Sequence, residues 1–162
     1  MYAVRRVGDH DAVLFIDPQV LDIFLFKGDV LRNAGPQGKA FIEGLETAPT
    51  ETRLKQSTVG IEKNGTVVPL SNTGGGITIR PSDSTSGGNE VYYDPSNLIN
   101  YQATDGTTVT ETPQGLLLHE LGHTSRLNSG DPAQTTGGAT AELNVRTTTN
   151  PIRTELKQKP EA

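Results

Sequence analysis

Cysteine and tryptophan are absent from this chain of 162 residues, and hydrophobic residues make up only 33% of it. The lack of cysteine excludes disulfides, thiolate metal sites and cysteine nucleophiles, so any metal must be held by histidine and carboxylate side chains. The low hydrophobic content, with 18 glycines and 10 prolines, predicts a modest core and long loops. The length fits a single domain, residues 1–162.

Positive charge and long apolar segments are also scarce. The net charge of −5 argues against nucleic acid as a partner. No apolar stretch approaches the length of a transmembrane helix, so no membrane partner is expected. Near the N-terminus Arg5 and Arg6 are followed by a polar segment before any apolar core forms, unlike a usual signal peptide. Three alternatives stay open: a cytoplasmic protein, export by another route, or a fragment of a longer chain.

Two of the three histidines, His119 and His123, flank Glu120 in a His-Glu-x-x-His pattern. Residues four apart lie on one face of a helix, so both imidazoles can reach the same metal ion. The glutamate lies next to that face, where it can take a proton from a water molecule that the metal activates. The pattern is typical of a zinc hydrolase, and it predicts Zn²⁺ as cofactor, the two histidines as ligands and Glu120 as general base.

The flanking residues predict a helix over residues 113–128 around this motif. Thr112 is a suitable N-cap, Pro113 fits the first helical position, and Gly130 fits a stop. Gly122 is a poor helix former, which suggests that another backbone or a substrate passes close to it. The alternative interpretation of the motif is an ordinary amphipathic helix with two surface histidines.

Zinc held by two imidazoles needs a third protein ligand and keeps a fourth position for water. One class of site continues the motif with a glycine and a third histidine, but this chain has Arg126 and Ser129 at those two positions. The third ligand must therefore come from elsewhere. The carboxylates downstream of the motif are Asp131, Glu142, Glu155 and Glu161.

Glu142 is the expected third ligand, and Asp131 is the alternative. Asp131 follows the end of the helix so closely that its side chain has little room to turn back. The glycines at residues 137–138 allow the later segment to fold back onto the helix and present Glu142.

The remaining patterns predict an α+β fold, a small zincin-like metallopeptidase domain with a few mostly antiparallel strands and a central motif helix. Strands are expected at residues 12–16, 52–60, 65–70, 77–80 and 91–94, and helices at residues 18–33, 38–45 and 151–157. Residues 130–140 carry only weak signals. The strand at residues 91–94 is the expected edge strand, which would run beside the motif helix and bind an extended peptide by strand addition.

An oxyanion in the transition state also needs a hydrogen-bond donor. The side chains that could supply it, each more often structural than catalytic, are Tyr92, Tyr93, Tyr101, Arg146 and Arg153. His10 is expected to be a surface residue in a turn.

Three blocks in the second half of the chain resemble the NleD-type zinc metallopeptidase effectors and related bacterial toxin domains. The blocks are residues 91–97, residues 116–123 with the metal motif, and residues 150–156, which are similar to an Asn-x-x-Arg-x-Glu block near the end of those domains. The chain departs from the pattern of this family at residues 157–159, where it has Lys-Gln-Lys in place of the usual Gly-Leu-Pro. Glu142 also stands outside the paired-glutamate setting of the family.

The resemblance implies a zincin-like fold and a protein delivered into other cells, where it cleaves a host protein. It carries His119 and His123 over as ligands, Glu120 as the catalytic residue and Glu142 as the glutamate between the blocks. The main hypothesis is therefore a secreted zinc endopeptidase that acts on a protein or peptide. The alternatives are an amidase or toxin domain that hydrolyses a cell-wall peptide, and a secreted interaction module without turnover.

Overall fold

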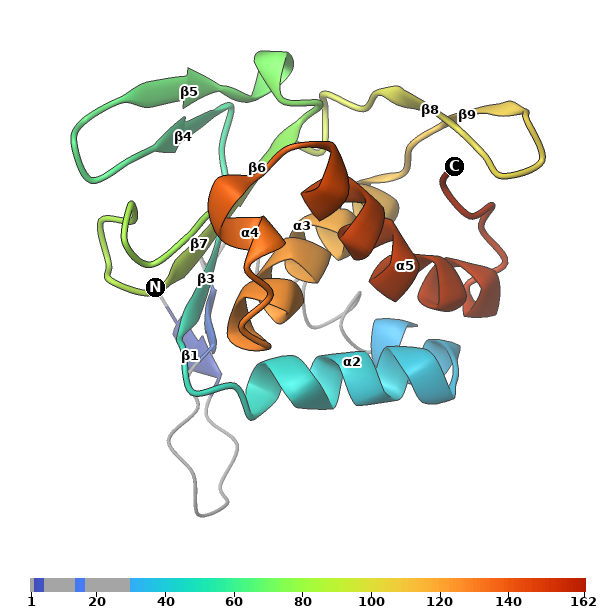
Figure 1. The fold of residues 1–162 in the computed structure, drawn as a ribbon, viewed down its shortest axis with the longest axis horizontal. Coiled ribbons are helices and arrows are strands. Elements are labelled where there is room, and N and C mark those ends of the chain that lie inside the picture. The colour runs from blue at the N-terminus through green and yellow to red at the C-terminus, as the bar shows by residue number, and fades with distance from the viewer. Residues whose placement is uncertain (1, 5–13, 17–29) are drawn as a thin grey trace.

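The computed structural model describes residues 2–4, 14–16 and 30–162, and its largest sheet has five strands (Figure 1). In spatial order these strands are β1 (Tyr2–Val4), β2 (Leu14–Ile16), β3 (Thr52–Gln56), β7 (Asn89–Tyr93) and β6 (Gly76–Ile79). The pairs β2–β3 and β3–β7 are parallel, whereas β1 and β6 pair antiparallel to their neighbours. The prediction of mostly antiparallel strands is therefore wrong for the centre of the sheet, since β2 and β3 are joined by a crossover connection whose described part is largely helical.

Four helices have both of their ends in the described part of the chain. They are α2 (Pro36–Glu46), α3 (Pro113–Asn128), α4 (Ala133–Thr136) and α5 (Ala139–Glu155). Residues 30–34 are also helical. Helix α3 lies against β6 and β7 and is packed on its other side by α5, while α2 contacts both α3 and α5 (Figure 1). None of the described helices is both long and apolar enough to cross a bilayer.

The main core forms where α3 meets the sheet and α2. Its buried members are Leu31, Phe41, Ile42, Leu45, Leu54, Val91, Tyr93, Leu116, Leu117, Leu118, Leu121 and Ile152. Four of them are leucines of the motif helix, so the apolar face of α3 is buried while its histidines lie at the edge of the core. The mixed helices and strands around this core confirm the α+β class.

Two hairpins and a short 3-10 turn complete the described chain. They are β4 (Val59–Ile61) with β5 (Val67–Pro69), β8 (Asn100–Gln102) with β9 (Thr108–Thr110), and η1 (Leu70–Asn72). The strand predicted at residues 52–60 is thus two strands that belong to different sheets. The expected hairpin turn at residues 63–65 lies between β4 and β5, as predicted.

Helix α3 has the bounds that its flanking residues predict. The side chain of Thr112 accepts a hydrogen bond from the backbone N–H of Gly115 at 3.0 Å, and Pro113 occupies the first helical position. Gly130 follows the helix with a φ of 74°, a conformation that favours glycine. These local signals determine both ends of the motif helix, and so fix which of its turns carry the histidines.

The final helix begins much earlier than predicted. Instead of residues 151–157, α5 covers Ala139–Glu155 and includes Pro151 in its interior. Its buried face contains Ala141, Val145, Thr149 and Ile152. Threonine and asparagine lower the helix propensity of this segment, but the spacing of its buried face lets it pack against α3, and packing outweighs propensity.

The edge strand expected at residues 91–94 is also a wrong prediction. Strand β7, which contains most of that segment, is paired on both sides, with β3 and with β6. In the described part of the chain β6 has β7 as its single neighbour, so β6 is the edge strand beside α3. The order of strands in a sheet depends on long-range pairing, which the pattern of one strand does not contain. The predicted helix at residues 18–33 lies mostly outside the described residues, as does His10.

Candidate metal centre

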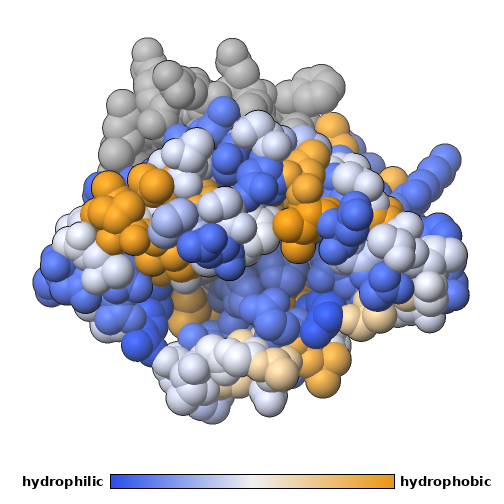
Figure 2. Space-filling view, turned by 90° about the horizontal axis from the view of Figure 1, so that it is seen from above, coloured by the Kyte–Doolittle hydropathy of each residue, from blue (hydrophilic) through white to orange (hydrophobic). Residues whose placement is uncertain are grey.

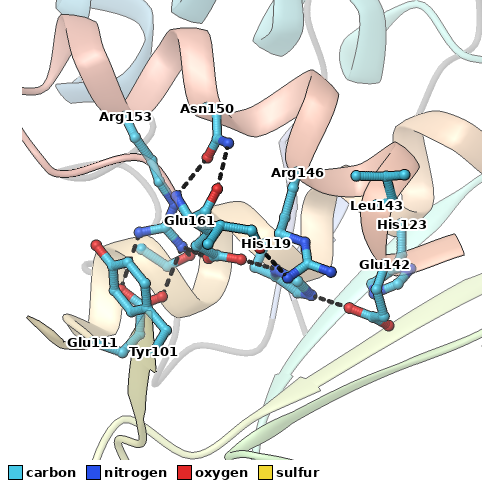
Figure 3. A network of polar contacts seen from close by, with 12 residues as sticks. Tyr101, Glu111, His119, His123, Glu142, Leu143, Arg146, Asn150, Arg153 and Glu161 are labelled. Carbon is cyan, nitrogen blue, oxygen red and sulfur yellow. Dashed lines mark hydrogen bonds and ion pairs between the residues drawn. The ribbon is translucent and has the colours of Figure 1, made fainter. Parts of the chain in front are cut away.

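Three predicted site residues meet where α3 and α5 cross. His119 and His123 occupy successive turns of α3, and Glu142 lies in the first turn of α5 (Figure 3). Nε2 of His119 is 3.0 Å from Oε2 of Glu142, and Nε2 of His123 is 3.3 Å from Oε1. One donor atom from each of the three side chains lies within 4.8 Å of the other two.

Glu142 reaches the histidines because the chain reverses between α3 and α5. Gly137 and Gly138 have φ values of 69° and 87°, which residues with a side chain rarely adopt. The backbone N–H of Glu142 then donates to the carbonyl of Gly138 at 3.1 Å, which starts α5. The glycine pair therefore acts as the sequence predicted and turns the carboxylate back toward α3.

Asp131, the alternative ligand, has other partners. Its Oδ1 accepts from the backbone N–H of Ala133 at 3.0 Å, and its Oδ2 accepts from the side chain of Asn144 at 3.1 Å. Both oxygens thus tie the end of α3 to α4 and α5. Asp131 is not among the residues that cluster with the histidines.

The two imidazoles are held at their far nitrogens as well. Nδ1 of His119 is 3.3 Å from Oε2 of Glu161, and Nδ1 of His123 is 2.9 Å from Oε1 of Gln134. The Gln134 amide nitrogen donates to the carbonyl of Ala141, so its oxygen must face His123. With Nδ1 carrying the proton, each ring turns its Nε2 toward Glu142.

This donor set fits a zinc ion. Bonds of about 2.0–2.1 Å in a tetrahedral site place neighbouring ligand atoms roughly 3.4 Å apart. The two separations between imidazole nitrogens and Glu142 oxygens, 3.0 and 3.3 Å, are close to that value. Two imidazoles and a carboxylate are also the ligand types found in one class of catalytic zinc site, in which water takes the fourth position.

The charges of the site are strongly coupled. Burial alone would lower the pKa of His119, but its hydrogen bonds to Glu142 and Glu161 outweigh burial and raise the pKa to about 10. For His123 burial is likewise outweighed, chiefly by Glu142, and the pKa is raised. The hydrogen bonds from His119 and His123 hold the pKa of Glu142 far below its usual range. Both imidazoles therefore hold a proton more tightly beside this carboxylate than a free imidazole does.

Glu120 lies beneath the edge strand with only 5% of its surface exposed. Its Oε2 is 2.8 Å from the hydroxyl of Thr78. A side chain at position 76 would clash with it, since a Cβ on Gly76 would lie 2.6 Å from Oε1. Burial raises the pKa of Glu120, and the two histidines reduce the shift. A carboxyl group with a raised pKa beside a metal site is suited to accept and return a proton.

All four side chains line one cavity of about 480 Å³. Its walls come from β6, from the segment that leads into β8, and from α3 and α5. From above, the molecule is hollowed near its centre, and the visible floor of the hollow is mostly hydrophilic (Figure 2). Thr73, Glu111 and Gln134 are polar side chains of this cavity beside Glu120 and the two histidines.

The five suggested oxyanion donors divide between the cavity and the interior. Tyr93 is buried in the main core, Tyr92 is hydrogen-bonded to Lys55 and Glu90, and Arg153 is buried among acidic partners. Tyr101 and Arg146 line the cavity.

Comparison of the chain with family models, with curated proteins and with solved structures finds no match.

Sequence reasoning did not identify Gln134 as a partner of His123, and it counted Glu161 only as one more carboxylate. A histidine ligand usually donates its second N–H to an acceptor, so the motif implied two such partners without indicating which residues they are.

Proposed function

We propose that this protein is a zinc-dependent endopeptidase with a zincin-like fold. The observation that carries the proposal is the convergence of His119, His123 and Glu142 from two helices, beside the buried carboxyl group of Glu120 and within one cavity. An amphipathic helix with two incidental surface histidines would not need a carboxylate from a second helix at hydrogen-bond distance from both rings.

The residues divide the chemistry among them. His119, His123 and Glu142 would hold Zn²⁺, which when bound supplies a Lewis acid that activates water and polarises a carbonyl group. Glu120 takes the proton of the attacking water and later delivers it to the leaving amine. Thr78 holds the carboxyl group of Glu120 in place during both transfers through its hydroxyl.

A peptide substrate is favoured by the edge strand. Strand β6 borders the cavity through Ile77 and Thr78, and its outer edge has no strand partner in the described chain. An extended peptide can pair with such an edge, which would carry its backbone past Glu120. Together with the resemblance of the second half of the chain to effector and toxin domains, this supports a protein substrate in another cell.

Arg146 is the best candidate for the oxyanion donor. It is the single arginine among the described residues that line the cavity, and it lies one turn after Glu142 on α5. Its Nη1 donates to the carbonyl of Ala162, and its guanidinium group has five N–H donors in all. A guanidinium group beside the cavity can bind a carbonyl oxygen as negative charge develops on it.

Metal content and proteolysis test the proposal together. The purified protein should bind about one Zn²⁺ per chain and cleave an unstructured protein such as casein. His119→Ala and His123→Ala should lose the zinc, and Glu142→Ala should weaken its binding markedly. Asp131→Ala is the matched control, because it removes a carboxylate near α5 that does not join the cluster, and it should bind zinc as the wild type does. A wild-type protein that binds no zinc, or cleavage of muropeptides but not of casein, would refute the endopeptidase assignment.

A further inference from the structure

Glu161 connects the candidate metal centre to a buried arginine. Its Oε2 is 3.3 Å from Nδ1 of His119, and its Oε1 pairs with Nη2 of Arg153 (Figure 3). The carboxylate therefore uses one oxygen for each partner. Glu161 lies on the Nδ1 side of the ring, away from Glu142, and so it is placed as a partner of the ligand rather than as a fourth ligand.

Arg153, the other partner of Glu161, is buried and held in place by its hydrogen bonds. Its surface is 0% exposed, and its guanidinium group donates to both oxygens of Glu111 at 3.1 and 2.6 Å. It also donates to the carbonyl of Gly115, at the start of α3, at 3.2 Å. A guanidinium group keeps its charge at any ordinary pH and has no acceptor. Every oxygen that faces Arg153 is thus required to accept a hydrogen bond.

The backbone of Glu161 is held independently of its side chain. Its N–H donates to Oδ1 of Asn150 at 2.8 Å, and its carbonyl accepts from Nδ2 of the same side chain at 2.8 Å. Glu161 also forms an isolated β-bridge with Ala103. These contacts place the segment over α5 and leave the carboxylate little freedom to turn away from His119.

We propose that Glu161 is a positioning residue for the metal centre, which keeps the proton of His119 on Nδ1 and thereby directs the lone pair of Nε2 at the metal. The proposal rests on the proposed function, since it concerns the same zinc site. The hydrogen bond orients the ring and makes it a stronger donor to the ion, as such outer carboxylates do in metal sites. Arg153 orients Glu161 in turn.

Glu161→Gln and Glu161→Ala should have different effects. In the glutamine variant the amide oxygen must face Arg153, because Arg153 can only donate. The NH₂ group then faces His119 and donates to Nδ1, which drives the proton to Nε2, the atom that should bind the ion. In the alanine variant water can still accept the proton from Nδ1. Glutamine, the closer match in shape, is therefore expected to weaken zinc binding at least as much as alanine.

The experiment is zinc titration against a chromophoric chelator at neutral pH, for the wild type, Glu161→Gln, Glu161→Ala and Glu111→Gln. Glu111→Gln is the matched control, because it removes the other carboxylate of Arg153 without touching His119. Like the Glu161 variants, Glu111→Gln should lose folding stability, but it should bind zinc as tightly as the wild type does. Both Glu161 variants should bind zinc about 10–100-fold more weakly. Affinities of the Glu161 variants equal to those of the wild type and of Glu111→Gln would overturn the inference and leave the zinc site itself intact, whereas a wild type without zinc would overturn both.

A second measurement needs no variant and so does not depend on whether one folds. Nitrogen NMR of the zinc-loaded wild type with labelled histidine reports which ring nitrogen of His119 carries the proton. We expect a protonated Nδ1 that exchanges slowly with water and a metal-bound Nε2. A metal-bound Nδ1 with the proton on Nε2 would refute the role of Glu161.

Discussion

Replacing Gly122 by alanine should disturb the proposed zinc site through the contact between the motif helix and α5. A Cβ at this position would lie 2.8 Å from Cγ1 of Val145 and 2.8 Å from Cγ2 of Thr149, both on α5. Carbon atoms pack best about 3.5–4.0 Å apart, so the added methyl group requires a shift of roughly 1 Å. Val145 and Thr149 are both fully buried, and α5 itself must therefore move away from α3.

The movement of α5 has a cost in stability and a cost in metal affinity. Overpacking of this kind destabilises a fold by about 1–3 kcal/mol, and the better helix propensity of alanine offsets about 1 kcal/mol of that. Glu142 lies one turn before Val145 on the same helix, so its carboxylate moves away from the two imidazoles. Because a metal site tolerates displacements of only about 0.5 Å, we expect zinc affinity to fall roughly tenfold or more in a chelator competition.

Gly44→Ala is the control for this prediction. Gly44 lies on the exposed face of α2, and a Cβ there would meet nothing within 4 Å. Alanine should stabilise the protein by about 1 kcal/mol in denaturant unfolding and leave zinc binding unchanged. Adding Val145→Ala to Gly122→Ala should restore part of the zinc affinity, since it removes one of the two clashing groups. If Gly122→Ala matched Gly44→Ala in both assays, the close approach of the two helices would not be what positions Glu142.

Three further predictions concern the chemistry. Glu120→Gln should retain zinc while casein hydrolysis falls by about 10²–10⁴-fold, and turnover at the wild-type rate would show that Glu120 is not the base. Arg146→Ala should lower kcat with zinc content unchanged and Arg146→Lys should recover part of it, whereas a shift in KM alone would assign Arg146 to ground-state binding. In the metal-free protein the raised pKa of His119, about 10, means that its protonated form stabilises the fold below pH 6.5 and that this contribution is lost as the pH rises toward 10. Zinc binds only the deprotonated ring. Thermal unfolding between pH 6.5 and 10 should therefore show that the metal-free protein becomes less stable as the pH rises, while its affinity for zinc increases. A zinc affinity that does not change with pH would contradict this coupling.

The parts of the site that follow from local signals could be predicted from the sequence. Thr112, Pro113 and Gly130 fix the ends of α3, and the four-residue spacing places both histidines on one of its faces. The choice of Glu142 over Asp131 as a candidate depended on the glycine pair before α5, whose positive φ values provide the reversal. Where the signal was not local the prediction failed. The part of α5 before Pro151 contains four threonines, and its helical state depends on packing against α3 rather than on propensity.

The hydrogen-bond acceptors of the two histidine Nδ1 atoms could not be identified from the sequence. Chemistry requires a partner for each Nδ1, and the chain offers many carboxylates, amides and carbonyls that could serve. Gln134 is selected because the short helix α4 places it beside His123 and because the carbonyl of Ala141 fixes its orientation. Glu161 is selected by Asn150 and Arg153, which lie on the half of α5 farther along the chain from Glu142. One helix thus supplies Glu142 to the near side of His119 and holds Glu161 at its far side, so any change that tilts α5 should disturb both contacts of the same imidazole at once.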